Sequence, residues 1–158
     1  MNVIYYNIIQ YLIIIIAIIR LIMGNRMGNR MDRDTYTNIL YNGMIIPLVI
    51  YSTIGHLIFR NSVADSIGWK SSPFQKELGY FTLSLLLVMI WSNYSNTRIK
   101  TKISLSYVWI IFIMFAALNH IYELKKGNMS LNNVLPIFLS FTVFILIIYN
   151  SYKFWHMQ

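Results

Sequence analysis

Four ionisable side chains are placed where they could carry chemistry in this sequence: His56, Glu77, His120 and Glu123. Each lies close to one end of a long apolar segment, where an ionisable group is costly unless it pairs with another group or faces a cavity. The chain contains no cysteine, so thiolate metal sites, disulfides and cysteine nucleophiles are excluded. We therefore take these four residues as the candidate ligand-binding site.

Metal binding is one chemistry that this set of residues could support. Two imidazoles and a carboxylate are a common ligand set for zinc or non-haem iron, and Glu123 or Asn119 could be a further ligand. The sequence has no H-x-x-x-H or E-x-x-H pair, and His120 and Glu123 have the spacing of the di-iron motif in the opposite order. A haem between His56 and His120 would require their rings to face one another. The metal and the cofactor therefore stay unassigned.

Two other interpretations use the same side chains. Histidine changes charge near neutral pH, so His56, Glu77 and His120 could relay protons or bind a polar head such as a quinone ring. Alternatively, they form a hydrogen-bonded clasp that joins three helices. No G-x-S-x-G, P-loop or G-x-G-x-x-G pattern is present, so no catalytic residues are assigned and the sequence favours a protein that is not an enzyme.

The composition restricts the class of protein. With 57% hydrophobic and only 11% charged residues, the chain falls well below the roughly 25% of charged residues in soluble domains. Too few polar side chains are available to cover a soluble surface. The net charge of +8 is spread over every connecting segment, which favours contact with lipid headgroups over binding of nucleic acid. The composition predicts an integral protein of a lipid bilayer.

Apolar segments of about twenty residues are long enough for a helix to cross ~30 Å of hydrocarbon. Five such segments span residues 3–23, 36–59, 73–93, 103–124 and 131–152. Pro47 is expected to kink the second helix, and Ser72 with Gln75 is expected to cap the third, which begins at Pro73. The chain is therefore predicted to be all-α, a polytopic transmembrane helical bundle that forms a single domain over residues 1–158.

Alternating helix directions bring the candidate residues to one level. His56, Glu77 and His120 then reach the same membrane face, each about one helical turn, or ~5 Å, inside the boundary. The other polar side chains expected at this level are Asn7, Gln10, Asn119 and Glu123.

The basic residues predict an orientation. Eight lie on one side of the predicted membrane: Arg20, Arg26, Arg30, Arg33, Arg98, Lys100, Lys102 and Lys153. Five lie on the other: Arg60, Lys70, Lys76, Lys125 and Lys126. The positive-inside rule then predicts an external N-terminus and a cytoplasmic C-terminus.

Two short sequence blocks resemble a known family. The block I-G-W ends at Trp69, the block S-P-F-Q-x-E-x-G runs from Ser72 to Gly79, and an Asn-His pair follows at His120. Between about Gly55 and His120 the chain resembles a family of small uncharacterised bacterial and archaeal polytopic membrane proteins, classed as a domain of unknown function. The resemblance implies a membrane topology and a site at His56, Glu77 and His120, but no reaction. After Gly79 the sequence Y-F-T-L departs from the small and amide residues expected in that family.

Two functions from different classes remain open. In the first, a membrane protein uses the intramembrane cluster to bind a ligand, a proton or a metal. In the second, the chain is a structural or accessory subunit of a larger assembly, such as a respiratory complex or a viral membrane, and the cluster is only a clasp. Either function allows a homo-oligomer or other membrane subunits as partners.

Overall fold

The computed structural model describes residues 3–26, 32–95 and 97–156, and the side chains of 8–24, 32–95, 97–153, 155 and 156. In this part of the chain all regular elements are helical, which confirms the predicted all-α class. The elements are α1 (Val3–Arg26), α2 (Arg33–Leu40), η1 (Tyr41–Ile45), α3 (Ile46–Leu57), α4 (Arg60–Ser66), α5 (Pro73–Tyr94), α6 (Ile99–Lys125) and α7 (Leu131–His156). The predicted apolar segments correspond to α1, the continuous run α2–η1–α3, α5, α6 and α7.

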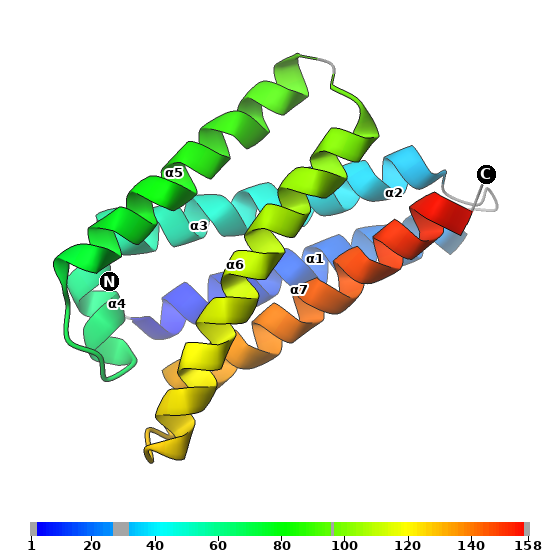
Figure 1. Cartoon of the computed structure of the whole chain (residues 1–158). Helices are drawn as coiled ribbons and strands as arrows, with labels where there is room; N and C mark the ends of the chain where they lie inside the picture. The colour runs from blue at the N-terminus through cyan, green and yellow to red at the C-terminus, as the bar shows by residue number, and fades with distance from the viewer. Residues whose placement is uncertain (1–2, 27–31, 96, 157–158) are drawn as a thin grey trace.

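The helices pack most extensively in two pairs, α3 with α5 and α6 with α7, while α5 and α6 contact each other much less. Figure 1 shows α5 and α6 close together near their connecting turn and farther apart toward their other ends. The short helix α4 lies at that open end, and α7 ends at the opposite end of the bundle. This divergence leaves room for a cavity between the two helix pairs.

The hydrophobic core lies where η1 meets the other helices. Tyr41, Met44 and Ile45 of η1 are fully buried and pack with Met89 of α5 and Ile110 of α6. Each long helix of this bundle also carries large apolar side chains that are exposed. A helix that packs along one stripe leaves the apolar side chains of its other faces on the outside of the bundle. Such a surface suits a lipid environment better than water.

The helix irregularity expected at Pro47 is a π-helical turn that precedes the proline. Tyr41–Ile45 is one turn of π-helix, in which the N–H of Ile46 donates to the carbonyl oxygen of Tyr41, five residues back. Proline lacks an N–H and clashes with the preceding turn of an α-helix, and a π-turn is one way to accommodate that change in hydrogen bonding. The helix α3 then begins at Ile46, with the proline in its first turn.

Three helical stretches among the described residues are long and apolar enough to cross a membrane. They are Arg33–Leu57, Ile99–Lys125 and Leu131–Lys153. The stretch Ile8–Gly24 is apolar but shorter, and α5 carries Lys76 and Glu77 close to its start. These properties fit a membrane protein, and they leave the number of crossings open.

Candidate functional site

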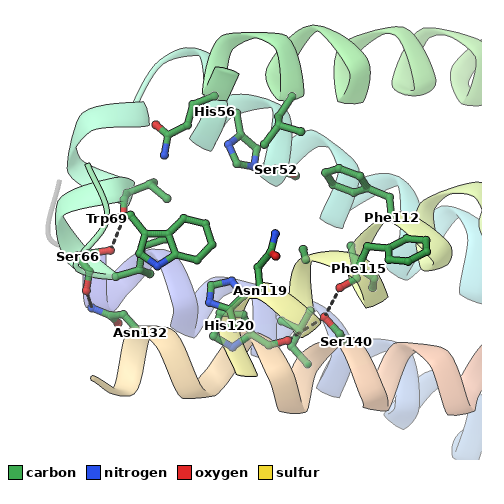
Figure 2. Close-up of a pocket in the computed structure, with 18 of the residues that line it drawn as sticks. Ser52, His56, Ser66, Trp69, Phe112, Phe115, Asn119, His120, Asn132 and Ser140 are labelled. Atoms are coloured by element: carbon green, nitrogen blue, oxygen red, sulfur yellow. Dashed lines mark hydrogen bonds between the residues drawn. The ribbon is translucent and has the colours of Figure 1, made fainter. Parts of the chain in front are cut away.

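A cavity of about 430 Å³ occupies the open end of the bundle, and side chains from α1, α3, α4, α5, α6 and α7 line it. We call this the cavity end. Figure 2 shows His56 and Ser52 on one side of the cavity, with Asn119 and His120 opposite them and Trp69 between the two sides. Two of the predicted residues, His56 of α3 and His120 of α6, thus face one space although they are far apart in the sequence.

Trp69 reaches the cavity through the way α4 ends. The N–H of Trp69 donates to the carbonyl oxygen of Ala64 (2.9 Å), and the N–H of Gly68 donates to that of Asp65 (3.1 Å). These two bonds form a Schellman motif, which requires a left-handed residue, and Gly68 has a φ of 75°. The I-G-W block is therefore a helix stop that turns the tryptophan back toward the bundle.

The end of α6 repeats this motif. The N–H of Asn128 donates to the carbonyl oxygen of Glu123 (3.0 Å), and Gly127 has a φ of 94°. The turn presents the side chain of Asn128, whose Nδ2 donates to the carbonyl oxygen of Ile67 (2.6 Å). The two helix ends are thereby joined, and they close the cavity at the end of the bundle.

His120 is held in place by Asn133 of α7 and by Trp69. Nδ1 of His120 lies 2.8 Å from Oδ1 of Asn133, a residue that is 0% exposed. The ring stacks on the indole of Trp69, with centroids 5.2 Å apart and an interplanar angle of 23°. One edge of the imidazole thus joins α6 to α7, while the side chain still lines the cavity.

His56 is positioned by the close approach of α3 and α5. Gly79 of α5 lies against Leu57 and His56, so that a Cβ placed at Gly79 would fall 2.5 Å from Cδ2 of Leu57. Thr53 and Thr82 strengthen the same contact with a hydroxyl–hydroxyl bond of 3.0 Å. Nδ1 of His56 is buried and has no hydrogen-bond partner among the described residues. No hydrogen bond from this nitrogen supports the predicted clasp in the described part of the chain, so the clasp stays a prediction for His56.

Gln75 has a different role from the predicted one. The helix α5 does begin at Pro73 with Ser72 at the N-cap position, but the Ser72 side chain makes no capping hydrogen bond. Gln75 is only 7% exposed and lines the cavity, and its Oε1 finds no partner among the described residues. The predicted capping pair is therefore wrong, because the amide turns into the bundle.

Glu77 does not line the cavity, and its side chain is exposed. Glu77 lies two positions after Gln75, which is about 200° around an α-helix, so it is on nearly the opposite face. The buried face of α5 is formed by Gln75, Gly79 and Thr82. The predicted depth of Glu77 is compatible with this placement, but its direction around the helix is not the one that a shared site would need.

Glu123 lies in the last turn of α6, is not among the residues that line the cavity, and accepts a hydrogen bond from Nζ of Lys126 (2.8 Å). This carboxylate raises the pKa of Lys126. Of the other polar residues predicted at this level, Gln10 and Asn119 line the cavity. The side chain of Asn7 lies outside the described residues, as do those of Arg26 and Arg30, which entered the orientation count.

The described residues also bear on the metal interpretation. Nowhere among them do three His, Asp or Glu side chains come together in an arrangement that could hold a metal ion. Glu77 and Glu123 are absent from the described lining of the cavity, and Glu123, near His120 on the same helix, is paired to Lys126. The site instead offers neutral hydrogen-bonding groups.

Comparison with known proteins gives a family. Residues 3–154 match a family of unknown function, DUF6790. The chain belongs to DUF6790. The match spans the whole bundle, beyond the segment from Gly55 to His120 in which the sequence blocks lie. No curated protein and no solved structure matches this chain.

Sequence reasoning missed several residues of this DUF6790 site. Trp69 entered the sequence analysis only as the end of the I-G-W block and Gln75 only as part of a helix cap, whereas both line the cavity. Asn128 and Asn133 hold its closed end. The glycines that follow α4 and α6 gave a usable signal, because a glycine just past a helix marks a reversal that brings the next residue back onto the bundle.

Proposed function

We propose that this chain is an integral membrane protein that binds a small amphipathic molecule in the cavity. The polar head would lie among His56, Gln75 and His120, and the apolar part would lie along Phe112 and Phe115. The observation that carries the proposal is the set of buried polar atoms at the cavity that lack partners among the described residues: Nδ1 of His56, Oε1 of Gln75 and Nε1 of Trp69. Buried polar atoms are normally hydrogen-bonded, so these side chains around one cavity favour a bound molecule that contributes partners.

The size and lining of the cavity support a small molecule as the ligand. Its volume of about 430 Å³ lies within the range of roughly 300–1,000 Å³ that is usual for ligand pockets. Most of the wall is apolar, with Leu48, Phe112, Ile113 and Leu139 contributing, and the polar groups gather beside Trp69. This division matches a molecule with one polar end and an apolar body.

The charges at the cavity support a neutral head. Lys70 is the one charged side chain among the described lining residues, and it is exposed. Burying an ion in apolar surroundings without a partner of opposite charge costs on the order of several kcal/mol. A charged head group would bear this cost in the cavity. Histidine and amide groups instead form hydrogen bonds with uncharged molecules.

The membrane setting extends this proposal. Five helical units cross the bilayer, with the N-terminus outside and the C-terminus in the cytoplasm, as the distribution of basic residues favours. The cavity then lies near one boundary, where a molecule with an apolar body can enter from the hydrocarbon while its head remains near the polar surface. The sparse contact between α5 and α6 supports an opening toward lipid.

A binding experiment tests the proposal. The protein is placed in lipid nanodiscs, and the binding of uncharged 4-octylphenol is measured by equilibrium dialysis against empty nanodiscs. Ala116 lines the cavity, so Ala116→Phe should weaken binding by about tenfold or more, because its ring takes up the ligand's space. Leu118→Phe, on the exposed side of the same helix, is the matched control and should bind as the wild type does.

The opposite results would reject the proposal. Absence of saturable binding of both 4-octylphenol and its methyl ether, or equal binding by Ala116→Phe and wild type, would show that the cavity is not a ligand site. A protein that also purifies together with other membrane subunits would then favour the structural or accessory role.

A further inference from the structure

The amide of Asn133 fixes the hydrogen-bonding state of His120. Nδ2 of Asn133 donates to the carbonyl oxygens of His120 (3.2 Å) and Asn128 (3.0 Å). Because both protons of this amide are used on carbonyl oxygens, the atom facing the imidazole is Oδ1, which can only accept. Nδ1 of His120, 2.8 Å away, must therefore carry the proton.

This tautomer defines what the ring offers to a ligand. In a neutral imidazole with a proton on Nδ1, the other nitrogen, Nε2, is an acceptor. Nδ1 is turned toward the buried Asn133, so Nε2 is the ring nitrogen left to meet a molecule in the cavity. Trp69 covers a face of the ring and not its edge, because the two rings are stacked.

The remaining open groups at the cavity complete this pattern. Oε1 of Gln75 is a second acceptor without a partner in the described chain, and Nε1 of Trp69 is a donor in the same state. A hydroxyl group can donate to one neighbour and accept from another, whereas a ketone or an ether can only accept. A ligand that leaves Nε2 and Oε1 unpaired would forfeit the hydrogen bonds that the cavity offers.

We propose that the ligand is a hydroxylated ring with an apolar chain, such as an alkylated phenol or quinol, whose O–H donates to Nε2 of His120. The ring lies beside the aromatic side chains of Trp69 and Phe112, and the chain extends toward Phe115 at the lipid side. Phe115 lines the cavity and is 66% exposed. This inference rests on the proposed function and adds the direction of the hydrogen bond.

Two probes with the same skeleton test the direction. 4-Octylphenol has the donor, and 4-octylanisole differs only by a methyl group on that oxygen. In nanodiscs, the phenol should bind about tenfold to a hundredfold more tightly than the anisole, because the ether leaves a buried acceptor unpaired. Equal affinity for the two probes overturns this inference and leaves the proposed function standing, whereas saturable binding of neither rejects the proposed function itself.

A variant locates the effect on His120. His120→Phe keeps an aromatic ring against Trp69 but removes both nitrogens, so the preference for the phenol should fall to within about twofold while the anisole binds as before. His156→Phe, in the exposed tail, is the matched control and should keep the full preference. A preference that persists in His120→Phe overturns the inference.

A measurement on the wild type covers the case in which His120→Phe does not fold. Nitrogen NMR of protein with ¹⁵N-labelled histidine distinguishes the two neutral tautomers, and His56→Gln and His156→Gln identify the remaining signal as that of His120. A proton on Nδ1 supports the inference. A proton on Nε2 overturns it, because that nitrogen would then be a donor.

Discussion

The two ends of the bundle differ in how completely their buried polar side chains are paired. At the end away from the cavity, polar residues from different helices pair directly, and we call this the paired end; its contacts are Thr37–Asn150 (3.1 Å), Tyr41–Ser92 (2.9 Å), Lys102–Asn38 (2.9 Å) and Tyr107–Ser151 (2.8 Å). At the cavity end, Nδ1 of His56, Oε1 of Gln75 and Nε1 of Trp69 and of Trp109 are buried without partners among the described residues.

This difference separates stability from function within one fold. Paired polar groups inside a bundle hold helices together, each bond adding on the order of 1 kcal/mol. Unpaired buried groups destabilise the empty protein, and a ligand that satisfies them recovers that loss on binding. We therefore expect substitutions at the paired end to change stability and substitutions of unpaired groups to change binding.

The largest loss of stability is expected at Asn133, which forms the hydrogen bonds that hold His120 at the cavity end. Asn133→Leu removes three hydrogen bonds at once and should lower the free energy of unfolding by about 3 kcal/mol, since two carbonyl groups and the imidazole N–H lose their partner. Thermal unfolding in detergent measures the change. Asn150→Leu, which removes the acceptor of the hydrogen bond from Thr37, is the control at the paired end and should lose about 1 kcal/mol. Equal losses would contradict this ranking.

A smaller loss is expected from the contact that positions His56. Gly79→Ala places a Cβ 2.5 Å from Leu57 and 3.2 Å from Cβ of His56, and should cost about 2 kcal/mol through overpacking of α3 against α5. The thermal unfolding of Gly79→Ala and of the double variant Leu57→Ala/Gly79→Ala measures this effect, with the exposed Ser84→Ala as control. If the new Cβ displaces His56, Gly79→Ala should also weaken 4-octylphenol binding, and the double variant should restore that binding. Failure to recover would show that Gly79 acts in another way.

The two Schellman turns give a matched pair of glycines. Both have a positive φ, so an alanine at either should cost about 1 kcal/mol in backbone strain. A Cβ at Gly68 would also meet Nδ2 of Asn128 at 3.1 Å, whereas one at Gly127 meets nothing within 4 Å. Gly68→Ala should therefore lose more stability than Gly127→Ala and should also weaken 4-octylphenol binding through Trp69. A larger loss of stability in Gly127→Ala than in Gly68→Ala, measured by urea or thermal unfolding, would contradict the contact between the two turns.

The smallest change in stability, and of opposite sign, is expected at Gln75. Gln75→Leu removes an unpaired buried acceptor, so the free energy of unfolding of the empty protein should stay constant or rise by up to about 1 kcal/mol, while 4-octylphenol binding falls. Ser92→Ala at the paired end breaks the bond to Tyr41 and should show the converse, a loss of about 1 kcal/mol with binding unchanged. If both variants lost stability and kept binding, the distinction between the two ends would not hold.

Much of the fold was predictable because membrane thickness sets the length of an apolar helix. The predicted boundaries at Pro73 and Leu131 agree with the starts of α5 and α7. The alternation of helices also predicted a common level for His56 and His120, and the structure places both at one cavity. Depth in a bundle follows from counting residues along each helix, which a single sequence provides.

The remaining part of the site depended on rotation around each helix axis and on tertiary turns. The sequence could place Glu77 along its helix, but its direction depends on which face of α5 packs against α3, and the close contact at Gly79 lies on that face. The role of Trp69 depends on a hydrogen bond between turns 61 residues apart, Asn128 to Ile67. Neither relation leaves a periodic signal in the sequence.

That bond between Asn128 and Ile67 also sets the order in which the site can be completed during synthesis. The turn after α4 leaves the ribosome long before Asn128 exists, and Asn133, which orients His120, follows later still. The earlier helices are therefore made with an unfinished pocket, and its floor closes only when α7 has been synthesised and packs against α6. A nascent chain halted before Leu131 would lack the Asn133 contact, so the closed end of the cavity would be incomplete.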